Sequence, residues 1–464
     1  MVIMRVVITN AEVDGRLVSV VIEDGFIVAV GEDSSAEDAS VIDARGGALL
    51  PGLHDHHVHL LAMAARRDGV DLDVLHDAAS FDRALTSAAS STPDGWIRAS
   101  GYDEHRHGSL DRHRIDALVG PTKVRVQHRT GLAWVLSTAG LDAVLTNDIP
   151  SGVERDFEGR PTGRLLRLDS WLAERVGVSA PSMKELGAEL AAFGITGVTD
   201  ATPNLGAGRI ELLQQAAGDG SLPQRLTLLG VHEEERSVVE GWATVGPAKI
   251  LVDEVVGLDP EALAKVIEKH HAVGRAVAIH AVSRAETVTA ATALALAGIQ
   301  QGDRIEHGSV LPADLDALLA DGGVTVIVQP GLVFERGDHY LNVVDGDDLA
   351  FLHRAGSLLN AGVRVAAGSD APVTSIDPWM AVAAASNRFT RTGRVLGANE
   401  RVEAATALGW YLTDPLDPGG PVRRVQVGAQ ADLCLLDAPF ADVLASPSAS
   451  HVRSTWVEGR LVYS

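Results

Sequence analysis

The chain of 464 residues has a single cysteine, Cys434, so it cannot form an internal disulfide. Because Cys434 lies in an apolar run at residues 431–436, we predict a buried structural thiol rather than a nucleophile. The sequence also lacks any apolar run of about 18 residues, the length that a membrane helix needs. Its first residues lack the charged start, apolar middle and small-residue cleavage site of a secretory signal. We therefore predict a cytoplasmic protein with no membrane segment.

Basic charge is scarce as well: 39 Lys and Arg oppose 62 Asp and Glu, for a formal net charge of -23. Such a surface repels phosphate backbones, which argues against nucleic acid and anionic membrane surfaces as partners. The sequence contains no short internal repeat and no low-complexity tract. Its length, with 46% hydrophobic residues, is sufficient for one large domain and one smaller one. These properties indicate a globular protein for which nucleic acid and membrane surfaces are poor candidate partners.

Both ends of the chain are rich in short β-type runs. They lie at residues 5–9, 17–22, 26–30, 41–44, 431–436 and 454–463. Two β-rich segments this far apart in the sequence predict a small composite domain, a β-sandwich formed by residues 1–50 and 420–464.

Between these ends, apolar β-runs alternate with helical stretches rich in Ala and Leu, the pattern of a parallel sheet with crossover helices. The runs lie at residues 48–59, 194–200, 225–230, 248–252, 276–280, 304–307, 324–329 and 363–370. We therefore predict an α/β fold, a TIM (β/α)8 barrel over residues 51–419. The gap between the first two runs is too long for one crossover, which predicts an insertion at about residues 65–180.

The first of these runs ends in a dense group of histidines, His54-Asp55-His56-His57-Val58-His59. Side chains alternate along a strand, so His57 and His59 point the same way and can hold one metal ion between them. Two solvated histidines are the alternative interpretation. The residues at the ends of the later runs favour the metal site.

Four further residues with suitable chemistry lie within or at the end of other predicted strands: Lys249, His280, His307 and Asp370. The carboxyl ends of barrel strands share one mouth, where active sites form. Each residue also has a structural alternative: Lys249 as a rim lysine, the two histidines as hydrogen-bonded core residues, and Asp370 as a helix cap. Their joint placement predicts one common cavity.

These motifs resemble the amidohydrolase superfamily, in particular the family-3 branch that includes N-substituted formamide deformylases. The resemblance covers nearly the whole chain, and it rests on Pro-Gly-X-X-Asp-X-His-X-His at 51–59, Gly95-Trp96-Ile97, Gly101-Tyr102-Asp103-Glu104, Pro161-Thr162-Gly163, Gly194-Ile195-Thr196, Arg304-Ile305-Glu306-His307, Gly368-Ser369-Asp370-Ala371-Pro372 and Gly428-Ala429-Gln430-Ala431-Asp432-Leu433.

The resemblance implies a binuclear metal centre. His57, His59 and Asp370 would bind the more buried ion, and His280 with His307 the more exposed one. Lys249 would carry CO₂ as a carbamate that bridges both ions. Glu306 and Arg304 are interpreted as barrel-wall or second-shell partners of this centre.

The same resemblance implies the chemistry. Imidazole and carboxylate-type ligands suit Zn²⁺, with Mn²⁺, Co²⁺ or Fe²⁺ as alternatives. Two ions would activate a bridging hydroxide, and Asp370 would act first as general base and then as general acid. The expected reaction is hydrolysis of a C–N bond in an amide, N-acyl or N-formyl compound. A homo-oligomer is also possible on this resemblance.

The departures from the family pattern concern the pocket rather than the metal ligands. Thr130-Gly131-Leu132, Arg167 and Asp253-Glu254 stand where other residues are usual, so the substrate assignment is open. Candidates for substrate contacts are Trp96, Tyr102, His128 and Trp134, with packing inside the insertion as the alternative interpretation for the aromatic residues.

Two other functions remain as alternatives. One is a mononuclear deaminase of a heterocycle, although Ser283 occupies the position where such enzymes carry a catalytic Glu. The other is a non-catalytic scaffold that has lost its metal, although all six ligand positions are occupied.

Overall fold

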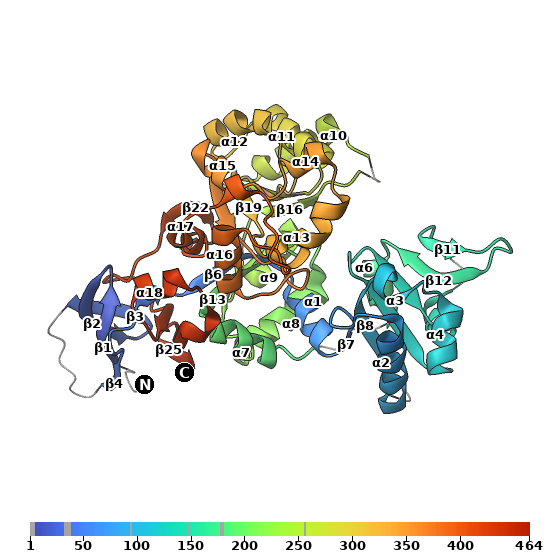
Figure 1. Cartoon of the computed structure of the whole chain (residues 1–464), viewed down its shortest axis with the longest axis horizontal. Helices are drawn as coiled ribbons and strands as arrows, with labels where there is room; N and C mark the ends of the chain where they lie inside the picture. The colour runs from blue at the N-terminus through green and yellow to red at the C-terminus, as the bar shows by residue number, and fades with distance from the viewer. Residues whose placement is uncertain (1–4, 32–38, 93–94, 147–148, 177–180, 255–256) are drawn as a thin grey trace. The chain divides into compact units, whose positions relative to one another are not determined.

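The computed structural model describes residues 5–31, 39–92, 95–146, 149–176, 181–254 and 257–464 (Figure 1). The chain divides into two compact units. Unit 1 comprises residues 1–60 and 183–464, and unit 2 comprises residues 61–182. Of the helices described, none combines the length and apolar character that crossing a bilayer requires.

Unit 1 contains two parallel sheets. The first has the order β15-β14-β13-β6, with bounds Thr244–Val245, Arg225–Leu228, Ile195–Asp200 and Leu53–Val58. The second has the order β16-β17-β18-β19-β20, with bounds Ala248–Leu251, Val277–Ala281, Arg304–His307, Thr325–Val328 and Arg364–Ala367. Each of the eight predicted runs overlaps one of these strands, and β15 is an additional short strand.

The predicted closed barrel is not found as one continuous ladder among the described residues. The two sheets are linked at one edge by an isolated parallel bridge between Val58 and Ala371. At the other edge, the backbone N–H of Lys249 donates to Leu229 O over 3.3 Å. A few such backbone links stand in place of a full ladder, so the described strands form an α/β fold with two parallel sheets rather than one continuous barrel ladder.

Four strands of these two sheets are covered on both faces, whether their residues are mainly apolar, as in β19, or mainly titratable, as in β6 and β18. Every residue of β6, β13, β18 and β19 is buried, as expected for parallel sheets with helices on their faces. The helices of unit 1 are α7 (Lys184–Ala192), α8 (Gly206–Gly218), α9 (Arg236–Val239), α10 (Pro260–Ala272), α11 (Arg284–Ala297), α12 (Asp316–Gly322), α13 (Gly331–Val343), α14 (Gly346–Leu349), α15 (Gly356–Asn360), α16 (Pro378–Asn387), α17 (Ala404–Gly409) and α18 (Phe440–Ala445). Their starts follow local capping rules: Asp259 caps α10, with Pro260 in its first turn, and Ser283 caps α11.

The two ends of the chain form two sheets in unit 1. One has the order β3-β2-β1-β4, with bounds Phe26–Gly31, Arg16–Glu23, Arg5–Val13 and Ser40–Asp43. The other has the order β25-β24-β23-β5, with bounds Arg460–Tyr463, Val452–Val457, Leu433–Leu436 and Leu49–Pro51. A short antiparallel pair, β21 (Thr413–Asp414) and β22 (Asp417–Val422), precedes β23 in the chain.

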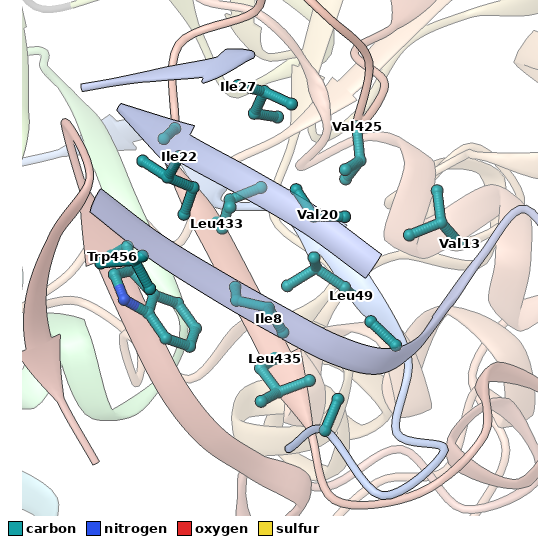
Figure 2. Packing of buried hydrophobic residues seen from close by; sticks show 14 residues of the cluster. Ile8, Val13, Val20, Ile22, Ile27, Leu49, Val425, Leu433, Leu435 and Trp456 are labelled. Carbon is teal, nitrogen blue, oxygen red and sulfur yellow. The ribbon is translucent and has the colours of Figure 1, made fainter. Parts of the chain in front are cut away.

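One hydrophobic cluster joins these two terminal sheets (Figure 2). Ile8 and Ile22 from the start of the chain share it with Leu435 and Trp456 from the end. Cys434 on β23 is buried, as predicted, and burial raises the pKa of its thiol to about 12. It is therefore a structural residue.

Unit 2 is a six-stranded sheet of order β11-β12-β10-β9-β8-β7. The bounds of its strands are Val153–Arg155, Pro161–Leu166, Ala133–Leu136, Lys123–His128, Trp96–Tyr102 and Val70–Asp71. Its helices are α1 (Leu60–Arg67), which begins in unit 1, α2 (Ala78–Ser91), α3 (Glu104–His107), α4 (Arg112–Val119), α5 (Thr138–Val144) and α6 (Asp169–Val176). Two clusters of buried apolar residues stabilise this unit.

Candidate metal centre

His57 is held at the carboxyl end of β6 by contacts to the segment that follows β20. Asp55 accepts hydrogen bonds from the backbone N–H of His57 over 2.9 Å and from that of Ser369 over 3.1 Å. A Cβ atom on Gly368 would lie 2.5 Å from the backbone nitrogen of His57. Only glycine therefore allows β20 to approach β6 this closely.

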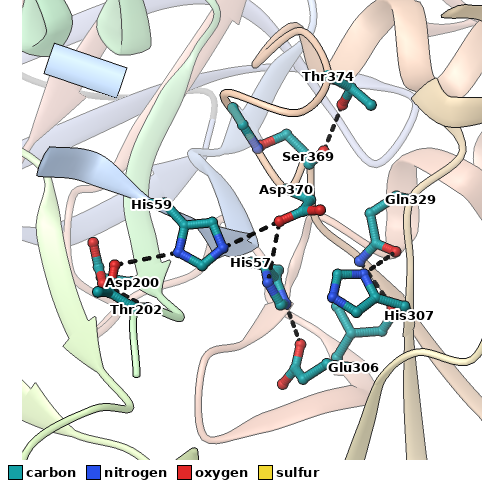
Figure 3. Close-up of polar contacts among 12 residues, drawn as sticks. His57, His59, Asp200, Thr202, Glu306, His307, Gln329, Ser369, Asp370 and Thr374 are labelled. Atoms are coloured by element: carbon teal, nitrogen blue, oxygen red, sulfur yellow. Dashed lines mark hydrogen bonds and ion pairs between the residues drawn. The ribbon is translucent and has the colours of Figure 1, made fainter. Parts of the chain in front are cut away.

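Asp370 lies next to His57 and His59 at the same end of the sheets (Figure 3). Its backbone N–H donates to His57 O over 2.7 Å, and its φ of +58° turns the chain sharply after β20. Asp370 Oδ1 lies 3.4 Å from His57 Nε2 and 3.2 Å from His59 Nε2. Among the described residues, these three offer ligand atoms that all lie within 4.8 Å of one another. This arrangement could hold one metal ion.

Glu306 contacts the other nitrogen of His57. The carboxylate accepts from His57 Nδ1, so Nε2 is left to face Asp370 (Figure 3). Arg304 Nε lies 2.6 Å from Glu306 Oε1, an ion pair that lacks the alignment of a hydrogen bond. Burial opposes the charge on Glu306, but Arg304, His57 and Lys249 hold its pKa well below the ordinary value. Glu306 is thus an ionised partner of His57.

Opposing effects also set the protonation of His57 and Asp370. Burial and the charge of Lys249 oppose protonation of His57, yet Glu306 and Asp370 together raise its pKa. Burial would raise the pKa of Asp370, but the neighbouring histidines hold it well below its ordinary value. The His57 ring therefore lies between two carboxylates, with Glu306 at Nδ1 and Asp370 facing Nε2, so a cation bound at Nε2 would be electrostatically favoured.

His307 and His280 continue the row of imidazoles. The ring centroids of His57 and His307 lie 4.7 Å apart, and those of His307 and His280 lie 4.6 Å apart. His307 has a φ of +74°, which turns its side chain away from strict alternation with Glu306. Burial lowers the pKa of His307 well below its ordinary value, and burial with Lys249 lowers that of His280 to about 4. Both rings are neutral near pH 7, the state that binds a metal.

Lys249 contributes a buried amine. Among the described residues its Nζ atom has no hydrogen-bond partner, which is rare for a buried polar atom. Burial lowers the pKa of Lys249 to about 8. Its charge acts on His57, His280 and His307, so the amine lies within electrostatic range of the histidine row.

The structure places the four candidate substrate contacts in unit 2. Trp134 is buried, and its Nε1 donates to Asp169 Oδ1 over 2.8 Å. Tyr102 is buried and donates to Gly108 O over 2.8 Å. Trp96 packs partly buried against the cluster that contains Trp134, and His128 contacts Glu104 over 2.9 Å. These contacts agree with the interpretation of the aromatic residues as packing inside unit 2.

Two partners of the histidines were missed in the sequence. His59 Nδ1 contacts Thr202 Oγ1 over 3.2 Å, and Gln329 Oε1 accepts from His307 Nδ1 over 3.0 Å (Figure 3). Because Nδ1 of His59 and of His307 is engaged in these contacts, Nε2 of each ring is the nitrogen available to a metal. Thr202 lies two residues beyond the end of β13, and Gln329 directly follows β19. Their positions just beyond strand ends were the available signal.

Comparison with known proteins supports this description. A model of the amidohydrolase family matches residues 40–463. N-substituted formamide deformylase from Arthrobacter pascens is 27% identical over 96% of this chain and 94% of that protein. Imidazolonepropionase from Ectopseudomonas mendocina (strain ymp) is 26% identical over 96% of this chain and 93% of that protein. The solved structure of an uncharacterized metal-dependent hydrolase from Pyrococcus horikoshii OT3 has the same fold, with a TM-score of 0.78, 19% identity and coverage of 97% of this chain and 99% of that chain.

Parallel strands that bring histidines and a carboxylate together at their carboxyl ends are typical of metal-dependent α/β hydrolases. With a family match over 40–463, the chain belongs to the amidohydrolase family. It is a hydrolytic enzyme that acts on carbon–nitrogen bonds. The family resemblance inferred from the sequence motifs is thereby confirmed.

Proposed function

We propose that this enzyme hydrolyses the C–N bond of a small amide, N-acyl or N-formyl compound with two divalent metal ions. The ligands would be His57, His59, Lys249, His280, His307 and Asp370. One observation carries the proposal: His57, His59 and Asp370 converge within 4.8 Å at strand ends, beside a row of neutral imidazoles.

The residues present fit such metal ions. His57 Nε2 and Lys249 Nζ are buried and, within the described part of the chain, make no hydrogen bond. Bound cations would complete the environment of these atoms. Imidazoles and carboxylate-type oxygens favour Zn²⁺, with Mn²⁺, Co²⁺ or Fe²⁺ as alternatives. With its pKa lowered to about 8, Lys249 has a sizeable neutral fraction, the form that reacts with CO₂ to give a carbamate.

The chain's own residues would then divide the work. When bound, divalent ions of this kind polarise a carbonyl oxygen and make water more acidic. The ionised carboxylate of Asp370 would take a proton from the attacking water and pass it to the leaving nitrogen. Glu306 would hold the proton on His57 Nδ1, which keeps His57 Nε2 directed at Asp370. No covalent intermediate with the protein is needed.

We also propose that the two parallel sheets form one (β/α)8 barrel over residues 51–419, with an insertion at about 65–180. The Val58–Ala371 bridge and the Lys249 backbone hydrogen bond to Leu229 support this, because they join the sheets at both edges. The shared core of the terminal sheets supports a composite β-sandwich from residues 1–50 and 420–464.

The alternative functions have less support. Ser283, where a deaminase would carry its catalytic Glu, instead caps α11 by accepting from Glu286 N over 3.2 Å. A scaffold without metal would not require the buried Lys249 amine to remain unpartnered.

The test is Lys249→Ala, with Lys265→Ala on the exposed side of α10 as the matched control. Metal content per chain and hydrolysis of a panel of N-formyl amines, N-acyl amines, lactams and carbamates are measured for both. We expect two ions in the unmodified enzyme and in Lys265→Ala, and at most one, with lost activity, in Lys249→Ala. A short carboxylate such as propionate should restore part of that activity. Full activity in Lys249→Ala would contradict the bridging role, and ammonia release from heterocycles alone would favour the deaminase.

A further inference from the structure

Two arginines occupy directly paired positions on one face of the sheet in unit 2. Arg98 on β8 and Arg125 on β9 are partners in the parallel register. The guanidinium carbon of each lies 5.6 Å from the ring centroid of Trp134 on β10. Two like charges are thus held against the same indole.

Neither arginine has an acidic partner among the described residues. The side chain of Arg125 makes no hydrogen bond to them, and the side chain of Arg98 makes one, from Nη2 to Gln127 Oε1 over 3.4 Å. The Nε atoms of both are buried and unpartnered. Burial lowers the pKa of Arg125, and burial with the charge of Arg125 lowers that of Arg98 to about 10, although Asp169 and Asp68 oppose the shift. The protein therefore keeps two partly buried cations together at a cost in stability.

Several other arginines of unit 2 do have acidic partners. Ion pairs to Asp or Glu side chains at 2.7 to 3.7 Å are made by Arg66, Arg106, Arg114, Arg129 and Arg160. The fold of this unit can thus supply acidic partners to arginines, but its described residues supply none to Arg98 and Arg125.

A third polar group lies on the same face. Ser100 is two residues beyond Arg98 on β8 and is opposite Gln127 in the register. It is only 6% exposed, and its Oγ atom has no hydrogen-bond partner among the described residues. A buried hydroxyl without a partner is expected where a ligand supplies one.

We propose that Arg98, Arg125 and Ser100 form an anion-binding site in unit 2 that takes the carboxylate of a small organic molecule. Guanidinium groups match the planar carboxylate through paired hydrogen bonds. The site adjoins the apolar cluster around Trp134, and a monoanion loses less hydration free energy there than a phosphate dianion would. The site goes beyond the proposed hydrolysis, because its ligands are distinct from the candidate metal ligands of unit 1.

The experiment measures binding of benzoate to the full-length, metal-loaded enzyme by calorimetry. The variants are Arg98→Gln and Arg125→Gln, with Arg160→Gln as the control, since Arg160 is an exposed arginine of the same unit paired with Asp156. We expect about ten- to hundredfold weaker binding in each of the first two variants. Arg160→Gln should bind benzoate like the unmodified enzyme. Arg125→Lys, which keeps the charge, serves if a Gln variant does not fold, and we expect it to bind benzoate more weakly than the unmodified enzyme.

Other results would overturn the site. Benzoate bound at the metal centre would keep its affinity in Arg98→Gln and Arg125→Gln. Inorganic phosphate that binds while benzoate does not would exclude a carboxylate site. Calorimetry requires no turnover, so an inactive enzyme would leave this test intact.

Once calorimetry shows that the variants have lost benzoate binding, steady-state kinetics can distinguish a carboxylate of the substrate from that of a separate effector. If the carboxylate belongs to the substrate, Arg125→Gln should raise KM for a carboxylate-bearing amide and leave KM for its methyl ester unchanged. If it belongs to a separate effector, both KM values should stay unchanged in the absence of benzoate. Either pattern agrees with the site.

Discussion

Glu306→Gln tests the part of the centre that lies behind the metal ligands. Glu306 and His57 have fully buried side chains that contact each other, and Arg304 is 1% exposed. Glutamine can still accept a hydrogen bond from His57 Nδ1, but it cannot balance the charge of Arg304. The substitution therefore removes a charge while it preserves the shape of the side chain.

The expected effects follow from this burial. Arg304 has no second acidic partner among the described residues, so Glu306→Gln leaves an uncompensated buried cation. Breaking such a pair costs about 3–5 kcal/mol of unfolding free energy. Loss of the anionic partner of a metal-binding histidine weakens metal affinity by about 10- to 100-fold. We expect both effects in Glu306→Gln.

The assay separates these effects with a matched control. Asp303→Asn removes another fully buried carboxylate, which directly precedes β18 and accepts from His271 Nε2 and Val277 N over 3.0 Å each. Urea unfolding of the metal-free proteins gives stability, and competition with a chromophoric chelator gives metal affinity. Both variants should lose stability, but only Glu306→Gln should lose metal affinity.

Unchanged metal affinity in Glu306→Gln would refute the positioning role of Glu306. Equal losses of metal affinity in both variants would show that general destabilisation, rather than the contact with His57, is responsible. An unfolding free energy equal to that of the unmodified enzyme would show that the pair with Arg304 does not stabilise the fold.

Two further predictions concern other parts of unit 1. Gly368→Ala should destabilise the fold by about 1–3 kcal/mol and abolish metal binding, because the new Cβ would overlap the backbone of His57. The control Gly346→Ala, whose new Cβ would meet no atom within 4 Å, should have neither effect. Retained metal binding in Gly368→Ala would contradict the close packing. Burial and the charge of Arg388 lower the pKa of His353 to about 3, below the value of about 6.5 in the unfolded chain. The stabilising contribution of neutral His353 is therefore complete above a pH of about 6.5 and declines as the pH falls toward about 3. His353→Asn should therefore lose less unfolding free energy than the unmodified enzyme between pH of about 6.5 and about 4, as measured by urea titration, and equal losses would count against a buried neutral His353.

The sequence alone determined the strands of unit 1 and the residues at their ends. Parallel strands covered on both faces have no solvent-facing side, so β19 and much of β13 appear as apolar runs that are visible without tertiary information. β6 and β18 are equally buried but consist mostly of His, Asp, Arg and Glu, and they were located by their histidines and their place in the alternating pattern. The positions of His57 and His59, and of the polar residues at the ends of later strands, were predicted from the same pattern. The single cysteine within an apolar run correctly indicated a buried thiol.

Only the tertiary structure decided how those side chains meet. Glu306 contacts His57, which is 249 positions away in the sequence, and local sequence patterns cannot predict such a long-range contact. The positive φ angles of His307 and Asp370 turn both side chains out of the alternation expected of a strand. The unpartnered arginines of unit 2 likewise depend on the register between β8 and β9, since burial and pairing are properties of the packed chain and not of the residue type.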